Sequence, residues 1–196
     1  MTAESSAAIT AVVLSGGRGS RLGGAEKSEV LWQGRSLLHH LLGSLAEAVP
    51  VVVVGPQVPT AREVRFTLEE PRFGGPVAAL AAALPLVETR RVFLVATDMP
   101  LAGRWLPLLQ AELDAVDPAD GTQGVFAVDS EGKWQPLCAV YDTEALRSAI
   151  AMLDTPVGAP LRAVTRGLKL AQAQSDGVTG RWLRDVDTPA DLAALD

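Results

Sequence analysis

A short apolar segment that ends in a glycine-rich loop constrains this chain more than any other feature. Residues 12–14 are strand-forming, and the loop after them holds five glycines and two arginines before it reaches Lys27. Glycine lets a backbone pass close to a ligand and adopt positive φ without a Cβ clash. Successive free N–H groups in such a loop form a concave anion site, to which cationic side chains add charge. The stretch therefore predicts a strand followed by a loop that holds the phosphates of a nucleotide.

The spacing of the glycines does not match the two best-known phosphate loops. The P-loop pattern places lysine directly after its last glycine, whereas two residues separate Gly24 from Lys27. The dinucleotide pattern G-x-G-x-x-G, begun at Gly17, needs its third glycine one position before Gly23. A nicotinamide-dependent oxidoreductase is accordingly disfavoured. A glycine-rich connection without any ligand remains an alternative at this point.

Length and composition indicate one α/β domain spanning residues 1–196. The chain is 48% apolar and 20% charged, which argues against disorder. Its net charge of −6 disfavours nucleic acid as a partner, because a phosphate backbone attracts a basic surface. The basic residues of the glycine-rich loop are then a local positive site, which suits a small anionic ligand.

The remaining compositional features exclude several kinds of site and location. The single cysteine, Cys138, allows no intramolecular disulfide, and its apolar surroundings indicate a core thiol rather than a nucleophile. The first ten residues lack the pattern of a signal peptide. No apolar stretch reaches the roughly 18–20 residues that span a bilayer. We therefore expect a cytoplasmic protein without a membrane partner.

Hydrophobic periodicity predicts strands that alternate with helices. We expect strands at residues 9–14, 51–54, 64–68, 91–97, 124–128 and 137–141, an edge strand at 168–173 and a last strand, or its end, at 182–187. We expect helices at residues 36–49, 76–84, 104–116, 143–153 and 161–166, and a terminal helix from residue 188. This alternation predicts a three-layer α/β/α, Rossmann-like fold with a mainly parallel central sheet.

Parallel sheets bind ligands at the carboxyl ends of their strands, which predicts where the functional residues gather. The glycine-rich loop, the turn at residues 69–76, Asp98 and Asp185 are expected on one rim. Asp98 directly follows an apolar strand, and a carboxylate beside a phosphate loop suits Mg²⁺. By position alone, a turn or helix-capping aspartate ahead of Pro100 is an equally good interpretation.

A third loop pattern, L-x-G-G-x-x-x-R-x-G-x-x-K, does fit the chain. It is formed by Leu14, Gly16, Gly17, Arg21, Gly23 and Lys27. This pattern resembles the MobA-like NTP transferase family, and within it the molybdenum cofactor guanylyltransferases. The family usually has alanine where Ser15 stands and aspartate where Glu26 stands. The run from Leu14 to Gly17 resembles the version of the loop that the family associates with guanine rather than cytosine.

The resemblance extends to four further segments and implies roles for residues in them. Residues 96–100 match the motif whose aspartate, here Asp98, ligates Mg²⁺ in the family. Residues 185–189 resemble both the acceptor-facing motif of the family and a metal-binding motif of distant sugar nucleotidyltransferases, so we hypothesise that Asp185 supports a metal. Glu70 matches a family aspartate that helps to bind the nucleotide. Gln135 resembles an acceptor-side glutamine, with a satisfied turn glutamine as the alternative.

The reaction that the resemblance implies is Mg²⁺-dependent transfer of GMP from GTP to the phosphate of molybdopterin cofactor, with release of pyrophosphate. Lys27, Arg21 and Asp98 are the expected catalytic residues, and Leu14, Ser15, Gly16, Gly17, Lys27, Glu70 and Asp98 the expected nucleotide-binding residues. Positioning and charge neutralisation carry such a transfer. Other proteins of molybdenum cofactor biosynthesis are conceivable partners. The alternatives are a transferase specific for CTP or a sugar phosphate, and a nucleotide-binding module without catalysis.

Overall fold

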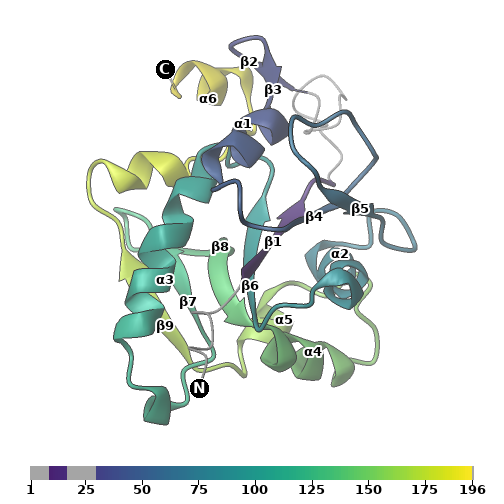
Figure 1. Cartoon of the computed structure of the whole chain (residues 1–196), viewed down its shortest axis with the longest axis vertical. Helices are drawn as coiled ribbons and strands as arrows, with labels where there is room; N and C mark the ends of the chain where they lie inside the picture. Colours follow the sequence, from purple (N-terminus) through teal and green to yellow (C-terminus); the bar gives the residue numbers. More distant parts are fainter. Residues whose placement is uncertain (1–8, 17–29, 196) are drawn as a thin grey trace.

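The computed structural model describes residues 9–16 and 30–195, and a seven-stranded sheet lies at its centre. The strands, in the spatial order β5-β4-β1-β6-β8-β7-β9, are β5 (Arg65–Thr67), β4 (Val51–Val54), β1 (Ile9–Leu14), β6 (Arg91–Ala96), β8 (Trp134–Asp142), β7 (Gly124–Val128) and β9 (Leu170–Gln174). Strand β8 is antiparallel to both neighbours, and the other four neighbouring pairs are parallel. The predicted mainly parallel sheet is confirmed (Figure 1).

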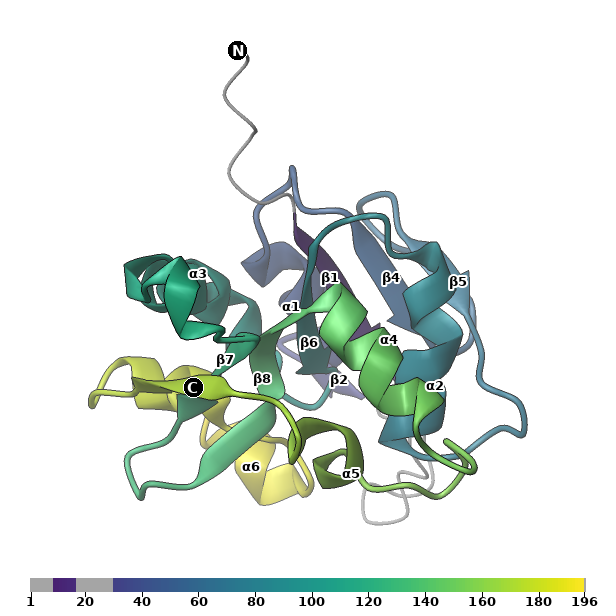
Figure 2. The same cartoon turned by 90° about the horizontal axis from the view of Figure 1, so that it is seen from below.

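Helices cover both faces of this sheet, as the alternating sequence pattern predicts. One face carries α1 (Leu37–Ser44) and α3 (Leu106–Ala115), and the other carries α2 (Pro76–Ala83), α4 (Thr143–Ala151) and α5 (Arg162–Thr165). Figure 2 shows α2 and α4 side by side, away from α3. The shorter helices are η2 (Leu84–Leu86), η3 (Ala102–Trp105), η4 (Pro118–Asp120), η5 (Thr179–Leu183) and α6 (Pro189–Ala193). Within the described ranges, no helix is long and apolar enough to cross a membrane.

The central strands divide their side chains between two hydrophobic cores. Along β1, Val13 packs under α1 and α3, whereas Val12 packs under α2 and α4. Leu94 and Val95 of β6 divide in the same way. A strand that is covered on both faces needs apolar residues at every position, which explains the continuous apolar runs in the sequence.

Two predicted elements differ from those observed, and a hairpin was not predicted. Helix α1 ends at Ser44 rather than near residue 49. Residues 182–187 form no strand. The helix η5 continues to Leu183, and the backbone N–H of Val186 donates to the carbonyl oxygen of Asp98 at 2.8 Å instead of to a neighbouring strand. The unpredicted hairpin pairs β2 (Leu31–Trp32) with β3 (Arg35–Ser36).

Three parallel strands end level with one another. Leu14, the last residue of β1, pairs with Val54 of β4 on one side and with Ala96 of β6 on the other. The segments that leave these strands therefore emerge along one edge of the sheet, where parallel α/β proteins bind ligands.

Candidate active site

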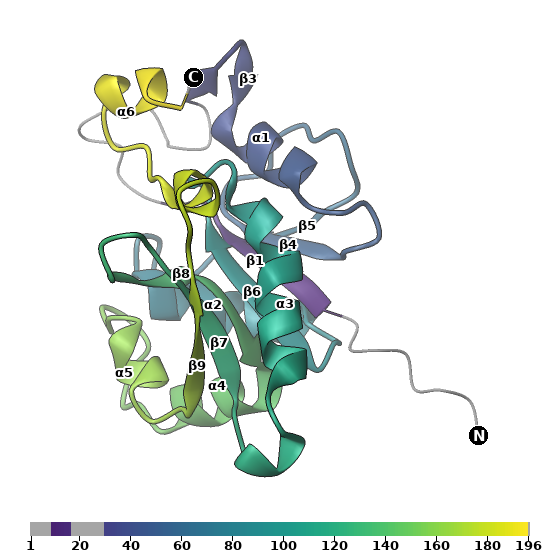
Figure 3. The same ribbon diagram turned by 90° about the vertical axis from the view of Figure 1, so that its left-hand side faces the viewer.

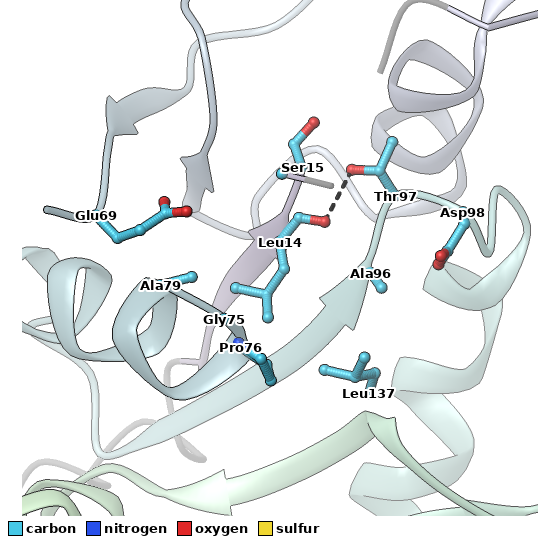
Figure 4. Close-up of a pocket in the computed structure, with 11 residues that line it drawn as sticks. Leu14, Ser15, Glu69, Gly75, Pro76, Ala79, Ala96, Thr97, Asp98 and Leu137 are labelled. Atoms are coloured by element: carbon cyan, nitrogen blue, oxygen red, sulfur yellow. Dashed lines mark hydrogen bonds between the residues drawn. The ribbon is translucent and has the colours of Figure 1, made fainter. Parts of the chain in front are cut away.

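A pocket of about 230 Å³ opens at the carboxyl ends of β1 and β6 (Figure 4). It is lined by Leu14, Ser15, Gly16, Glu69, Gly75, Pro76, Ala79, Ala96, Thr97, Asp98 and Leu137. The pocket thus joins the ends of two central strands, the turn before α2, the first turns of α2 and the strand β8. Four of the predicted site residues, Leu14, Ser15, Gly16 and Asp98, lie together in this lining.

Backbone hydrogen bonds hold the two strand ends together. The N–H of Thr97 donates to the carbonyl oxygen of Leu14 at 3.0 Å, and the Thr97 hydroxyl donates to the same oxygen at 3.2 Å. On the other side, the N–H of Ser15 donates to the carbonyl oxygen of Val54 at 2.8 Å. These bonds fix the first residues of the loop beside the turn that carries Asp98.

Asp98 lies at one end of the pocket and Glu69 at the other, with the side chains of Leu14 and Pro76 between them (Figure 4). Asp98 is half-buried at the exit of β6. Mg²⁺ binds proteins through one or two carboxylates and fills its other positions with phosphate oxygens and water. Among the described residues, no group of three or more histidine, cysteine, aspartate or glutamate side chains is placed to hold a metal. The carboxylate of Asp98 at this strand end fits an ion that takes most of its other ligands from phosphates and water.

The segment with Asp185 runs beside Asp98, as predicted, although it forms no strand. The bond from the Val186 N–H to the Asp98 carbonyl oxygen joins the two segments. Val186 is fully buried, whereas Asp185 is exposed and Asp187 is half-buried. Asp185 is not part of the pocket lining. Its support of a metal stays a prediction.

Glu69, rather than the predicted Glu70, supplies the pocket's second carboxylate. Glu69 is 7% exposed, lines the pocket and accepts a hydrogen bond from the N–H of Phe73 at 3.0 Å. Glu70 is exposed and is not part of the lining. The loop has neither helical nor strand periodicity, so sequence alone offers no signal for which of two adjacent glutamates points inward. Burial of a carboxylate beside a cavity is the observation that distinguishes them.

Ser15 contributes a buried hydroxyl. Its side chain is 3% exposed, and its Oγ has no hydrogen-bond partner within residues 9–16 and 30–195. A buried hydroxyl without a partner is costly, which makes such a group a candidate donor to a ligand. The contact with Gly55 is close, since a Cβ on that glycine would lie 3.0 Å from the Ser15 Cβ.

The remaining predicted residues of the glycine-rich loop, Gly17, Arg21 and Lys27, lie outside the described residues. Their roles in phosphate binding stay predictions that rest on the sequence pattern. Leu14 and Gly16, at the start of the same loop, lie in the pocket.

Gln135 has a structural partner in the turn between β7 and β8. Its Nε2 donates to Oδ2 of Asp129 at 2.9 Å, and Oδ1 of Asp129 accepts the N–H groups of Glu131 and Lys133. Partial burial raises the pKa of Asp129, but the hydrogen bonds from Lys133, Gln135 and Glu131 together outweigh it and hold the pKa below its ordinary value. The alternative of a turn glutamine therefore has direct support.

Burial keeps the thiol of the single cysteine in its neutral form. Cys138 is fully buried in β8, and this burial raises the pKa of its thiol far above its ordinary value. A thiol held in its neutral form is a poor nucleophile. The prediction of a core thiol is confirmed.

The sheet, its two helical layers and the pocket at the carboxyl ends of β1 and β6 are typical of α/β proteins that bind ligands at the ends of their parallel strands. The family model of the MobA-like NTP transferase domain matches residues 11–175. The chain therefore belongs to the MobA-like NTP transferase family and is an enzyme of the nucleotidyltransferase class, as the loop pattern predicts.

Individual relatives agree with this assignment. A probable molybdenum cofactor guanylyltransferase from Deinococcus radiodurans is 32% identical over 195 residues, which cover 95% of this chain and 93% of that protein. The molybdenum cofactor guanylyltransferase of Pseudomonas syringae pv. tomato is 26% identical, covering 94% of this chain and 91% of that protein.

Solved structures agree on the fold. The molybdopterin-guanine dinucleotide biosynthesis protein A of Archaeoglobus fulgidus superposes with a TM-score of 0.69 at 22% identity, covering 95% of this chain and 96% of that one. The 2-C-methyl-D-erythritol 4-phosphate cytidylyltransferase of Thermus thermophilus gives a TM-score of 0.63 at 18% identity, covering 94% and 95%. At these identities the likeness shows the fold alone.

Proposed function

We propose that this enzyme transfers GMP from GTP to the terminal phosphate of molybdopterin cofactor and releases pyrophosphate, with Mg²⁺ as its metal. The names of its relatives support the two substrates. The observation that carries the proposal is the pocket that brings the start of the glycine-rich loop, Glu69 and Asp98 together at the sheet edge.

The positions of the two carboxylates suggest how the nucleotide lies. Asp98 and Glu69 occupy opposite ends of the pocket (Figure 4). In this proposal the triphosphate lies at the end with Asp98 and the base lies at the end with Glu69. Lys27 and Arg21 neutralise phosphate charge, in roles that rest on the sequence pattern alone.

In the reaction, a phosphate oxygen of the acceptor attacks the α-phosphorus of GTP. The bond from that phosphorus to the bridging oxygen breaks, and pyrophosphate leaves with the bonding electron pair. Asp98 holds the metal, which supplies charge neutralisation at the phosphates when it is bound. The chain's own residues bind and orient the two substrates, and none acts as a covalent nucleophile.

Glu69 gives the pocket a basis for choosing guanine. An ionised carboxylate only accepts hydrogen bonds, and its two oxygens offer about four sites. The Phe73 N–H uses one of them. Guanine presents two adjacent donors, the ring N1–H and the 2-amino group, on the edge that faces such an acceptor. Uracil and cytosine lack this pair of donors, so the carboxylate favours guanine.

Two measurements test the proposal. In thermal-shift titrations with Mg²⁺, we expect GTP to stabilise the protein more than CTP or UTP does. In a pyrophosphate-release assay with molybdopterin cofactor, we expect Asp98→Asn to lower the rate by roughly a hundred-fold or more. Stabilisation by CTP alone would overturn the choice of guanine. Failure of the wild-type enzyme to release pyrophosphate with this acceptor would contradict the proposed reaction.

A further inference from the structure

The strand β8 continues past the pocket toward the connection with β7. Val95 of β6 pairs with Cys138 of β8, and Leu137, the next residue toward the connection, lines the pocket beside Asp98. Strand β6 ends at Ala96, whereas β8 extends back to Trp134. The first residues of β8 therefore project beyond the end of β6, on the same side of the molecule as α6 (Figure 3). These residues lead away from the pocket, whose lining on β8 is Leu137.

Trp134 is the first residue of β8, and much of its side chain is exposed to solvent. The side chain is 59% exposed, and its ring packs on Phe126 with the ring centroids 4.6 Å apart. Phe126 belongs to the same hydrophobic core as Leu14 and Ala79, two residues that line the pocket. Trp134 thus lies on the face of the sheet to which the pocket belongs.

The turn that directly precedes Trp134 is held by the side chain of Asp129. This carboxylate accepts hydrogen bonds from the N–H groups of Glu131 and Lys133 and from the amide of Gln135, on both sides of the tryptophan. A further backbone bond joins the N–H of Asp129 to the carbonyl oxygen of Lys133 at 3.0 Å. An exposed ring that packs on Phe126 beside a fixed turn can bind a ligand without a large loss of side-chain entropy.

The size of the pocket leaves one substrate outside it. A ligand of the size of a typical drug occupies a site of roughly 300–1,000 Å³, so a cavity of about 230 Å³ cannot enclose a nucleotide and a second substrate together. In the proposed orientation the triphosphate lies at the end with Asp98, so the acceptor approaches at that end, where Leu137 of β8 also lines the pocket. Trp134 lies three residues before Leu137 on the same strand, beyond the end of β6.

We propose that the exposed indole of Trp134 is the surface on which the planar pterin ring of the acceptor stacks. The inference rests on the proposed function, because it takes the acceptor to be molybdopterin cofactor. Stacking of a planar nitrogen heterocycle on an aromatic side chain strengthens binding roughly five- to hundred-fold. Trp134 therefore sets the affinity for the acceptor and leaves the binding of GTP unaffected.

Steady-state kinetics of dinucleotide formation by the full chain separate the two substrates. We expect Trp134→Ala to raise the KM for molybdopterin cofactor roughly ten-fold or more, with the KM for GTP unchanged. Trp134→Phe keeps an aromatic face and should restore most of the acceptor affinity. Glu131→Ala removes an exposed side chain from the turn before Trp134 and should behave as the wild type. Thermal unfolding checks that each variant is folded.

The outcomes distinguish this inference from the proposed function. If the wild type makes the dinucleotide and Trp134→Ala keeps the wild-type KM for the acceptor, the stacking role is wrong. An equal rise in both KM values would also overturn it, because that pattern indicates a general structural effect. If the wild type makes no dinucleotide, the proposed function fails, and the inference fails with it.

Discussion

Two adjacent glutamates differ in burial, and the difference predicts different roles. Glu69 is buried at the pocket, whereas Glu70 is exposed. We expect Glu69→Gln to raise the KM for GTP roughly ten-fold or more, because a hydrogen bond to a charged group is worth about 1.5–3 kcal/mol. Glutamine keeps an oxygen that can accept the Phe73 N–H, so the loop should keep its fold. The measurement is steady-state kinetics with GTP varied.

Glu70→Gln is the matched control for this change. It removes the same charge one residue away, on the exposed side of the loop. We expect it to leave the KM for GTP within about two-fold of the wild type, as is usual for exposed substitutions. A larger effect from Glu70→Gln than from Glu69→Gln would reverse the assignment made from burial.

The sequence predicted the position of some pocket residues and not of others, for physical reasons. Leu14 and Asp98 end apolar strands, and the carboxyl end of a parallel strand has a known relation to ligands. Glu69 lies in a loop, where the direction of each side chain depends on tertiary contacts rather than on periodicity. Its carboxylate is held by the N–H of Phe73, whose φ of 63° no simple pattern predicts.

At the scale of elements, an arginine distant in sequence, Arg62, binds the last turn of α1 and the segment that follows it. The guanidinium of Arg62 donates to the carbonyl oxygen of Leu42 in the last turn of the helix. It also donates to the carbonyl oxygens of the segment that follows, those of Leu45, Ala46, Glu47 and Val49. The last carbonyls of a helix lack partners within it, and a cation near them also interacts favourably with the helix dipole. Apolar spacing could not predict this end, since Arg62 lies 13 to 20 residues further along the chain.

Loss of this contact should destabilise the protein. We expect Arg62→Ala to lower the free energy of unfolding by about 2 kcal/mol, because several carbonyl groups lose a charged donor. Urea denaturation at constant pH measures the change. Arg62→Lys should recover only part of it, since one ammonium cannot reach both groups of carbonyls that the planar guanidinium spans. A midpoint equal to that of the wild type for Arg62→Ala would show that the contact is not needed.

The last segment shows the same limit of sequence patterns. Residues 182–187 are predicted to form a last strand or its end, yet two of their N–H groups find partners outside the sheet. The Val186 N–H bonds to Asp98, and the N–H of Asp187 bonds to the carboxylate of Asp191. One local and one long-range hydrogen bond therefore take the place of strand pairing in this segment.

At the scale of the whole molecule, three carboxylates link stability to pH. Hydrogen bonds lower the pKa values of Asp129, Asp176 and Asp191 below their ordinary value of 3.8. For Asp191 the hydrogen bond from the Thr188 hydroxyl lowers the pKa most, followed by the bonds from the N–H groups of Asp187 and Thr188. A carboxyl with a lowered pKa in the folded state contributes stability that is complete above its unfolded value and is lost as the pH falls through the lowered value.

We therefore expect the thermal midpoint to fall as the pH is lowered from about 5 to below 3. Asp191→Asn should lower the midpoint near pH 6 and should also reduce the acid-induced drop, because one of the three titrating groups is gone. Asp154→Asn, at an exposed position, is the control. Differential scanning calorimetry measures all three proteins. An acid-induced drop that is the same in Asp191→Asn and in the wild type would contradict the linkage to this carboxylate.

The architecture as a whole was the most predictable level. Continuous apolar runs such as residues 51–54 require cover on both faces, and the alternation of such runs with helical periodicity specifies layers. The antiparallel direction of β8 is also consistent with its short connection to β7 at residues 129–133. Strand β8 pairs with β6, which is distant in sequence, as well as with its neighbour β7. The apolar pattern of the sequence does not indicate this long-range pairing.

The most direct test of the account is to incubate the purified enzyme with GTP, Mg²⁺ and molybdopterin cofactor and to identify the products by mass spectrometry. The pocket at the ends of β1 and β6 predicts a guanine dinucleotide of the cofactor together with an equal amount of pyrophosphate, and roughly a hundred-fold less of both in the same time with Asp98→Asn. Formation of a cytosine dinucleotide in place of the guanine one, or of no dinucleotide from any nucleoside triphosphate, would contradict it.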